Sequence, residues 1–211
     1  MRTLFSLLAS LIAICLLSTS GGCDENDGLP VPANGDYYPL KIGNQWQYEL
    51  THKFVCDCPN GFELRDTINV SIDEDVLPEE SIYTLLHDDT YLYQKLVRKN
   101  GSKYYESQPY RFEYIFLRDD KPVNYTWKEK SLGVNLTVRQ INGSLMVDGT
   151  LYVDVIEIEE FLSYPDLPQQ YTQTRRFFAK DIGEIYSLKT VYSPDYGTET
   201  YELILLEHTK P

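Results

Sequence analysis

Histidine, a common metal ligand and the side chain best suited to proton transfer near neutral pH, is scarce in this 211-residue chain and widely spaced. The three histidines are His52, His87 and His208, and they form neither an HxH nor an HExxH pattern. A zinc site needs three or four ligands that converge on one point. The spacing therefore predicts isolated histidines on strands or at the surface, and we expect no metal and no cofactor.

Acidic pairs recur at 73–75, 79–80, 88–89 and 119–120 and could support two kinds of chemistry. Oxygen-rich loops suit calcium, and paired carboxylates about 5–9 Å apart hydrolyse glycosides. The chain has neither the EF-hand spacing nor a G-x-S-x-G nucleophile motif. We therefore expect solvated loop charges and a protein that is not an enzyme, with an envelope or glycan hydrolase as one alternative.

The four cysteines stand at positions 15, 23, 56 and 58, and the last two, Cys56 and Cys58, are separated by one residue. Thiols outside the cytoplasm tend to be oxidised. We expect a local disulfide between Cys56 and Cys58 at the tip of a loop. Free or intermolecular thiols are an alternative, and so is a soft-metal site, which would need further ligands.

Aromatic residues recur in the middle of the chain. They are Tyr104, Tyr105, Tyr110, Tyr114, Tyr125 and Trp127. Such residues could form an exposed platform for a glycan or line a pocket for an apolar ligand. Because aromatic residues that alternate along strands more often fill a core, we favour a structural role.

The first 22 residues have the order of a secretory signal peptide. Arg2 is followed by the apolar run 4–17 and then by small, polar residues. A permanent membrane helix needs about 20 apolar residues, so this run is too short. The segment Ser20-Gly21-Gly22-Cys23 resembles the lipobox of bacterial lipoproteins, although Ser20 stands where an aliphatic residue is usual. The resemblance implies removal of residues 1–22 and attachment of fatty acyl chains such as palmitate to Cys23. An ordinary signal peptide with an incidental cysteine is the alternative.

Residues 23–36 are expected to form a flexible acidic tether behind the lipidated cysteine. Asp24, Glu25 and Asp27 precede a stretch with proline and glycine, and such a segment lacks the apolar content to fold. Fully extended, it would reach about 45 Å. The acidic run resembles the surface-export signal of lipoproteins in one group of Gram-negative bacteria. In another group, Asp directly after the cysteine retains lipoproteins at the inner membrane. We expect the outer membrane, with the domain periplasmic or exposed at the cell surface.

The formal net charge of −13 excludes one class of partner. Nucleic-acid phosphates repel a strongly acidic chain that has no basic stripe. The same charge disfavours flat adsorption on anionic lipid. We expect the membrane to be a partner through the lipid on Cys23, and a further envelope protein, glycan or lipid partner remains open.

From residue 43 onward, the pattern is one of strands and turns. Trp46, Tyr48, Leu50, His52 and Phe54 alternate with polar residues, which is typical of a half-buried strand. Hairpin turns are predicted at Asn100-Gly101, Asn142-Gly143 and Asp148-Gly149. The only helix expected is a turn or two near 78–85. Residues 37–211 are thus predicted to form one all-β domain of about ten to eleven antiparallel strands, as a curved sheet or open half-barrel.

Three short motifs resemble a group of uncharacterised bacterial lipoproteins. The opening YYPLKIGNQWQY (37–48) is similar to the group's YYPLxxGNxWxY, and GTLYVDVI (149–156) and FAKDIGEI (178–185) follow in the same order. The resemblance covers most of 37–207 and implies no substrate, cofactor or active site. Some members of the group share the half-barrel of lipoprotein carriers, an analogy of fold only. Within these motifs we expect Gly43 and Gly183 to adopt positive φ angles, and Trp46 and Tyr48 to lie in the core.

These observations lead to three hypotheses on function. The first is a non-enzymatic lipoprotein of the cell envelope that serves as a binding or assembly module on a tether. The second is a carrier that holds an apolar or lipid ligand inside the curved sheet. The third is the hydrolase, which would require carboxylates or histidines converging on a cleft.

Overall fold

The computed structural model describes residues 36–56, 61–77, 80–87, 92–107, 113–130 and 132–211. The predicted signal peptide (1–22), Cys23 and all but the last residue of the predicted tether (23–36) lie outside the described residues. The fold below is therefore that of the β-rich part of the chain.

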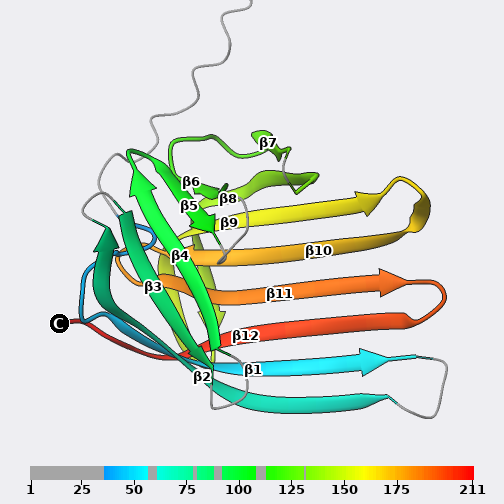
Figure 1. Cartoon of the computed structure of the whole chain (residues 1–211), viewed down its shortest axis with the longest axis horizontal. Coiled ribbons are helices and arrows are strands. Elements are labelled where there is room, and N and C mark those ends of the chain that lie inside the picture. Colours follow the sequence, from blue (N-terminus) through cyan, green and yellow to red (C-terminus); the bar gives the residue numbers. More distant parts are fainter. Residues whose placement is uncertain (1–35, 57–60, 78–79, 88–91, 108–112, 131) are drawn as a thin grey trace, which may run out of the picture. The chain divides into compact units, whose positions relative to one another are not determined.

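Twelve antiparallel strands form a single sheet (Figure 1). They are β1 (Gln45–Val55), β2 (Phe62–Leu77), β3 (Glu80–His87), β4 (Leu92–Asn100), β5 (Lys103–Ser107), β6 (Tyr114–Arg118), β7 (Thr126–Glu129), β8 (Val134–Val147), β9 (Thr150–Tyr164), β10 (Leu167–Ala179), β11 (Gly183–Ser193) and β12 (Gly197–Thr209). The described residues contain no helix. The prediction of an all-β fold built on a curved antiparallel sheet is confirmed.

The strand order places the first and last strands in the middle of the sheet. The order is β6-β5-β4-β3-β2-β1-β12-β11-β10-β9-β8-β7, so two meanders of six strands are joined by pairing of β1 with β12. The edges of the sheet are β6 and β7, which are consecutive in the chain. The sheet can therefore fold over so that its two edges approach each other.

The short helix expected near 78–85 is wrong, because β3 occupies Glu80–His87. This strand pairs with β2 on one side and β4 on the other. The two neighbours supply the backbone hydrogen bonds that a helix would otherwise make within itself. Tertiary pairing thus overrides a local pattern that is compatible with either structure.

Two of the three predicted hairpin turns are present. Gly101 (φ 60°) follows Asn100 between β4 and β5, and Asp148 and Gly149 (φ 44° and 77°) join β8 to β9. The turn predicted at Asn142-Gly143 is wrong, because both residues lie inside β8. The pairing of β8 with β9 shifts register on both sides of Gly143, and Asn142 has a positive φ of 51°. The Asn-Gly pair therefore forms an irregularity within β8, and the strand pairs with β9 both before and after it.

The core lies where β5 and β6 pack against the strands of the second meander. The ring of Phe116 on β6 lies 5.8 Å from that of Phe178 on β10, and Tyr38 contacts both rings edge-on. Trp46 and Tyr48 are 3% and 4% exposed, as predicted. We call the face of the sheet that carries these two residues the inner face.

The first and third of the motifs used for the resemblance contact each other in this core. Trp46 Nε1 donates to Ile182 O (2.6 Å), and Tyr48 OH donates to Glu184 O (2.9 Å). Gly183 between them has a φ of 108°, and a Cβ there would lie 3.2 Å from Trp46 Nε1. Gly43 also has a positive φ, of 91°. The positive φ angles predicted for both glycines are confirmed, and these motif residues have structural roles.

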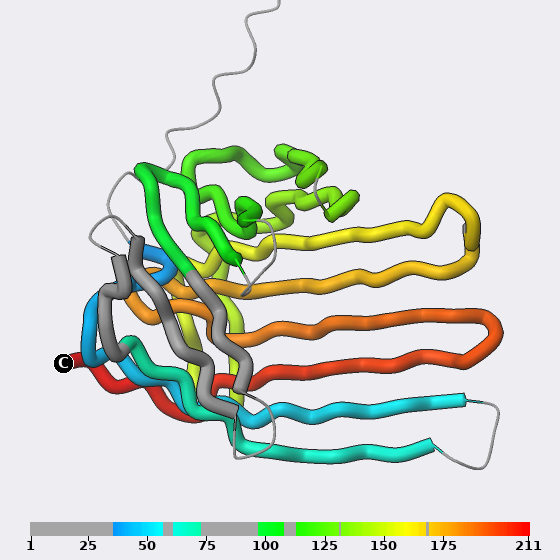
Figure 2. The backbone as a smooth tube through the Cα atoms, in the orientation of Figure 1, coloured from blue at the N-terminus to red at the C-terminus, as the bar shows by residue number. Residues whose placement is uncertain are grey.

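Beyond the core, six strands continue side by side as an extension of the sheet. Strands β2, β1, β12, β11, β10 and β9 are paired in that order along their length, as Figure 2 also shows. Val55 and Leu64 near one end of this extension are 52% and 61% exposed. Among the described residues, this part of the sheet has no second layer comparable to β5 and β6.

Candidate functional site

An open cleft of about 440 Å³ lies on the inner face, at the border between the core and the extension. Its aromatic and apolar lining consists of Tyr38, Tyr48, Leu50, Ile68, Val70, Tyr114, Val134, Leu162, Tyr201 and Leu203. Its polar lining consists of Glu106, Glu160, Thr172, Thr174, Arg176, Glu184, Ser187 and Lys189. The cleft is formed because β5 and β6 end here while the long strands continue.

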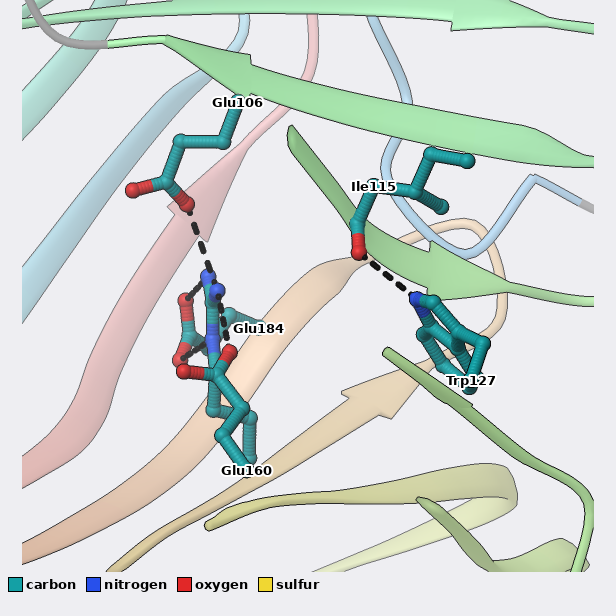
Figure 3. A network of polar contacts seen from close by, with 6 residues as sticks. Glu106, Ile115, Trp127, Glu160 and Glu184 are labelled. Atoms are coloured by element: carbon teal, nitrogen blue, oxygen red, sulfur yellow. Dashed lines mark hydrogen bonds and ion pairs between the residues drawn. The ribbon is translucent and has the colours of Figure 1, made fainter. Parts of the chain in front are cut away.

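A buried arginine organises the polar side of the cleft (Figure 3). Arg176 on β10 donates from Nε and Nη2 to the two carboxylate oxygens of Glu184 on β11, at 2.9 and 2.8 Å. Its Nη1 also donates to Glu106 on β5 (3.2 Å) and to Glu160 on β9 (3.4 Å). Three carboxylates thus converge on one guanidinium, two from the strands on either side of β10 and one from β5 in the opposite layer.

The surroundings fix the charge of this cluster. Burial alone would lower the pKa of Arg176, but the carboxylates of Glu184 and Glu106 raise it, and the net pKa lies well above its ordinary value. The guanidinium carbon also lies 4.7 Å from the ring centre of Phe116 and 5.1 Å from that of Phe178. Arg176 is therefore a permanent cation clamped between aromatic rings, and bidentate pairing with Glu184 holds it rigidly.

The phenol of Tyr114 belongs to the same polar group. Burial raises the pKa of Tyr114 well above its ordinary value, and the neighbouring Glu106 and Glu160 raise it further. The protonated hydroxyl consequently serves as a hydrogen-bond donor to Glu106. Carboxylates held by donors in this way are positioned acceptors for the polar groups of a ligand.

A second polar group lies further along the inner face of the extension. His52 Nε2 contacts Glu199 Oε1 at 2.7 Å, and Tyr201 OH donates to the same oxygen at 2.7 Å. The His52 and Tyr201 rings are stacked with their centres 4.2 Å apart. The hydrogen bond from Tyr201, followed by the contact with His52, lowers the pKa of Glu199. The arrangement presents stacked rings beside a carboxylate at the open end of the cleft.

The structure does not bring the three histidines together. His52 lies on the extension, whereas the His208 ring stacks on Trp46 with centres 5.3 Å apart. His208 Nε2 is buried without a hydrogen-bond partner among the described residues. His87 is the last residue of β3. Within the described ranges, no three His, Cys, Asp or Glu side chains are placed to hold a metal ion.

Of the three cysteines for which predictions were made, only Cys56 lies within the described residues. Cys56 forms a disulfide. Cys58 and Cys23 lie outside the described residues, so the pairing of Cys56 with Cys58 and the lipidation of Cys23 stay predictions.

Asp119 and Asp120, an acidic pair within the described residues, form hydrogen bonds and ion pairs with nearby side chains. Asp120 forms ion pairs with Arg118 (3.4 Å) and Lys121 (3.1 Å). Asp119 Oδ2 accepts a hydrogen bond from Tyr104 OH at 3.1 Å. These contacts differ from the solvated loop charges that we expected, and they explain the pair without a bound cation.

Most of the aromatic candidates have structural positions, as we favoured. Tyr104 is fully buried, Trp127 is largely buried and stacks on Tyr125, and Arg98 lies over the ring of Tyr105. Tyr114 alone of the described candidates lines the cleft. Tyr110 lies outside the described residues.

The charged residues of the cleft were missed by the sequence analysis. Arg176 follows Thr172 and Thr174 at alternate positions of β10, and Glu160 follows Ile156 and Ile158 on β9 in the same manner. A charged residue on the inward side of a strand is unusual, because a buried charge is costly unless it is paired. That feature could have identified both residues, although their partners depend on strand register.

Comparison with known proteins shows only distant structural similarity. No model of a known protein family matches the chain, and no curated protein is significantly similar to it. A crystal structure of a candidate lipoprotein from Parabacteroides distasonis is similar with a TM-score of 0.46 and 10% sequence identity, over 83% of this chain and 99% of that one. Within the described ranges, no helix is long and apolar enough to cross a membrane.

Proposed function

We propose that this chain is a cell-envelope lipoprotein, anchored in the outer membrane through Cys23, whose β domain binds a ligand in the cleft without transforming it. The order of signal peptide, lipobox-like segment and acidic spacer supports the anchor. The observation that carries the binding role is the cleft itself. It combines an apolar lining with polar groups that are fixed on rigid strands, which is the usual composition of a ligand site.

The geometry of the carboxylates favours binding over catalysis. Glu184 already accepts two hydrogen bonds from Arg176, and Glu106 and Glu160 face the same guanidinium. A glycosidase needs one carboxyl group that carries a proton and can release it. Here all three carboxylates instead accept hydrogen bonds from the same guanidinium. These side chains are suited to accept hydrogen bonds from hydroxyl, amide or ammonium groups.

Substitution on β11 can test the cleft with a matched control. Ser187 lines the cleft, whereas Thr190 points to the opposite face of the same strand. We expect Ser187→Trp to fill the cleft and Thr190→Trp to leave it open. The probes are peptidoglycan fragments, neutral oligosaccharides and micelles of short-chain phosphatidylethanolamine. At least one class should raise the thermal midpoint of the wild type and of Thr190→Trp but not that of Ser187→Trp. Equal shifts in both variants, or no shift with any probe, would refute the proposal.

The anchor has its own test. Cells that produce the wild type, Cys23→Ala or Cys56→Ala are grown with radioactive palmitate. We expect label in the wild type and in Cys56→Ala, and none in Cys23→Ala. Label in Cys23→Ala would show that the acyl chain is elsewhere.

The carrier and hydrolase alternatives each have one supporting observation. Leu50, Leu162 and Leu203 give the cleft an apolar wall, which would suit a lipid ligand. Lipid that copurifies with the wild type but not with Ser187→Trp would favour the carrier.

The hydrolase gains support from the convergence of three carboxylates on the cleft. Release of sugar from peptidoglycan or aryl glycosides by the wild type, abolished in Glu160→Gln, would favour it. Absence of turnover in the wild type would leave the binding role.

A further inference from the structure

The hairpin that joins β8 to β9 has an apolar face exposed to solvent. Met146, Leu151 and Val153 are 60%, 59% and 62% exposed. Met146 pairs with Leu151 across the hairpin, and Val153 follows two residues later on the same strand, so all three share one face. The opposite face packs against the core through Leu145 and Tyr152. We call Met146, Leu151 and Val153 the hairpin patch.

The hairpin patch lies beside the point where the β domain begins. Asp181 N donates to Asp36 O at 2.7 Å, and Asp36 N donates to Asp181 Oδ1 at 3.3 Å. The neighbouring Lys180 N donates to Asp154 O on β9 at 3.3 Å. This loop and residues 150–154 line a common groove. Asp36 is therefore held next to the strand that carries Leu151 and Val153.

The chain before Asp36 determines what can reach this face. Only twelve residues, 24–35, separate Cys23 from Asp36. As the flexible tether that the sequence predicts, a segment of that length would have an end-to-end distance of roughly 20 Å. A lipid on Cys23 would thus hold the bilayer within reach of Asp36 and of the neighbouring hairpin.

We propose that the hairpin patch contacts the surface of the bilayer that holds the acyl chains of Cys23. The inference rests on the proposed anchor and adds a second contact that orients the domain. A soluble antiparallel sheet usually presents polar side chains on its solvated face, so three neighbouring apolar side chains require an explanation. Contact with lipid removes them from water.

The tether explains why so small a patch is sufficient. Three side chains alone are a weak membrane signal, and the net charge of −13 opposes adsorption on anionic lipid. Attachment through a short linker makes the contact intramolecular, at an effective concentration of about millimolar. The contact should therefore form only in the lipidated chain and best on zwitterionic lipid.

Amide hydrogen exchange reports directly on this hairpin. Val147 pairs with Thr150 next to the two-residue turn, so the amides of Leu151 and Val153 point away from the partner strand. They should exchange quickly in the Cys23→Ala chain in solution. In the lipidated wild type, reconstituted in vesicles of phosphatidylcholine and phosphatidylethanolamine, we expect them to exchange several-fold more slowly.

Two variants and flotation separate this proposal from the anchor. Leu151→Asp should remove the slower exchange without preventing flotation, whereas Tyr196→Asp, at an exposed residue of the β11–β12 turn, should change neither. The Cys23→Ala chain mixed with the same vesicles should show no slowing. If the wild type floats with the vesicles but these amides stay fast, the membrane contact is wrong and the anchor stands. If the wild type does not float, both are wrong.

Discussion

The core half of the sheet and its extension use the same strands in different surroundings. Along the inner face of β1 and β2, Trp46 and Ile72 are 3% and 2% exposed near one end, whereas Leu64 is 61% exposed towards the other. Alternation is preserved throughout, but only the core half is covered by β5 and β6. Alternation therefore determines which face a side chain occupies, whereas its burial depends on a layer contributed by a distant part of the chain. The cleft lies at the border of the two halves, where apolar side chains meet open space.

The strongest contrast should come from phenylalanines of the two halves. Phe178 is fully buried in the core, whereas Phe54 lies half-buried on the extension. We expect Phe178→Ala to lower the free energy of unfolding by about 3–5 kcal/mol, because it leaves a cavity. For Phe54→Ala we expect a loss under about 2 kcal/mol. Urea unfolding of the lipid-free Cys23→Ala chain measures both, and equal losses would contradict the division into two halves.

Adjacent arginines on β10 allow a similar comparison within one strand. The side chain of Arg176 is 6% exposed and bound by three carboxylates, whereas that of Arg175 is 48% exposed and paired with Glu157. Arg176→Met should cost about 3–5 kcal/mol, because it leaves buried carboxylates without their cation. Arg175→Met should cost less, about 1–3 kcal/mol, because the arginine is itself half exposed and only one buried carboxylate, Glu157, loses its partner. Chemical denaturation checks both, and a mild effect of Arg176→Met would show that the cluster is not held as described.

The two edge strands, β6 and β7, are joined by hydrogen bonds from side chains and not by backbone pairing. Trp127 Nε1 on β7 donates to Ile115 O on β6 at 3.0 Å (Figure 3), and the Glu129 carboxylate accepts from the backbone of Ile115. Trp127→Phe keeps an aromatic ring but leaves this carbonyl without its donor, so we expect a loss of about 1–2 kcal/mol. Tyr125→Phe, directly before β7, serves as the control and should have little effect, because its hydroxyl accepts a long hydrogen bond of 3.5 Å from Arg118. Equal thermal midpoints for the wild type and Trp127→Phe would show that the bridge contributes nothing.

The smallest expected effect concerns pH. Burial, and then the charge of Lys210, lower the pKa of His208 below 6.5. The unfolded chain therefore binds this proton more readily than the folded one, and stability falls as the pH drops through about 6.5 towards the lower folded pKa. His208→Gln removes this contribution. Between pH 7.5 and pH 5, the thermal midpoint of the wild type should decrease more than that of the variant. A parallel decrease in both would exclude His208 as the source.

The sequence was sufficient for the local features of the fold. The alternation from Trp46 to Phe54, the turns at Asn100-Gly101 and Asp148-Gly149, and the positive φ of Gly183 follow from short-range stereochemistry. The failures share a cause. Both segments adopt strand structure because other strands pair with them, β2 and β4 with β3, and β9 with β8 on either side of Asn142-Gly143.

The candidate site could not be predicted from the sequence, for the same reason. Glu106 and Arg176 are 70 residues apart in the chain and meet only because the first meander folds over the second. No local pattern determines that register. The exposed hairpin patch likewise follows from the position of the turn and of the covering layer, although its three apolar residues are visible in the sequence.

The most direct test of the binding role is native mass spectrometry of the protein extracted from its own membrane in neutral detergent. We predict an additional mass that is released on denaturation, retained by Thr190→Trp and absent from Ser187→Trp. A wild type that carries only its acyl chains, or the same additional mass in Ser187→Trp, would contradict the assignment of the cleft as the ligand site.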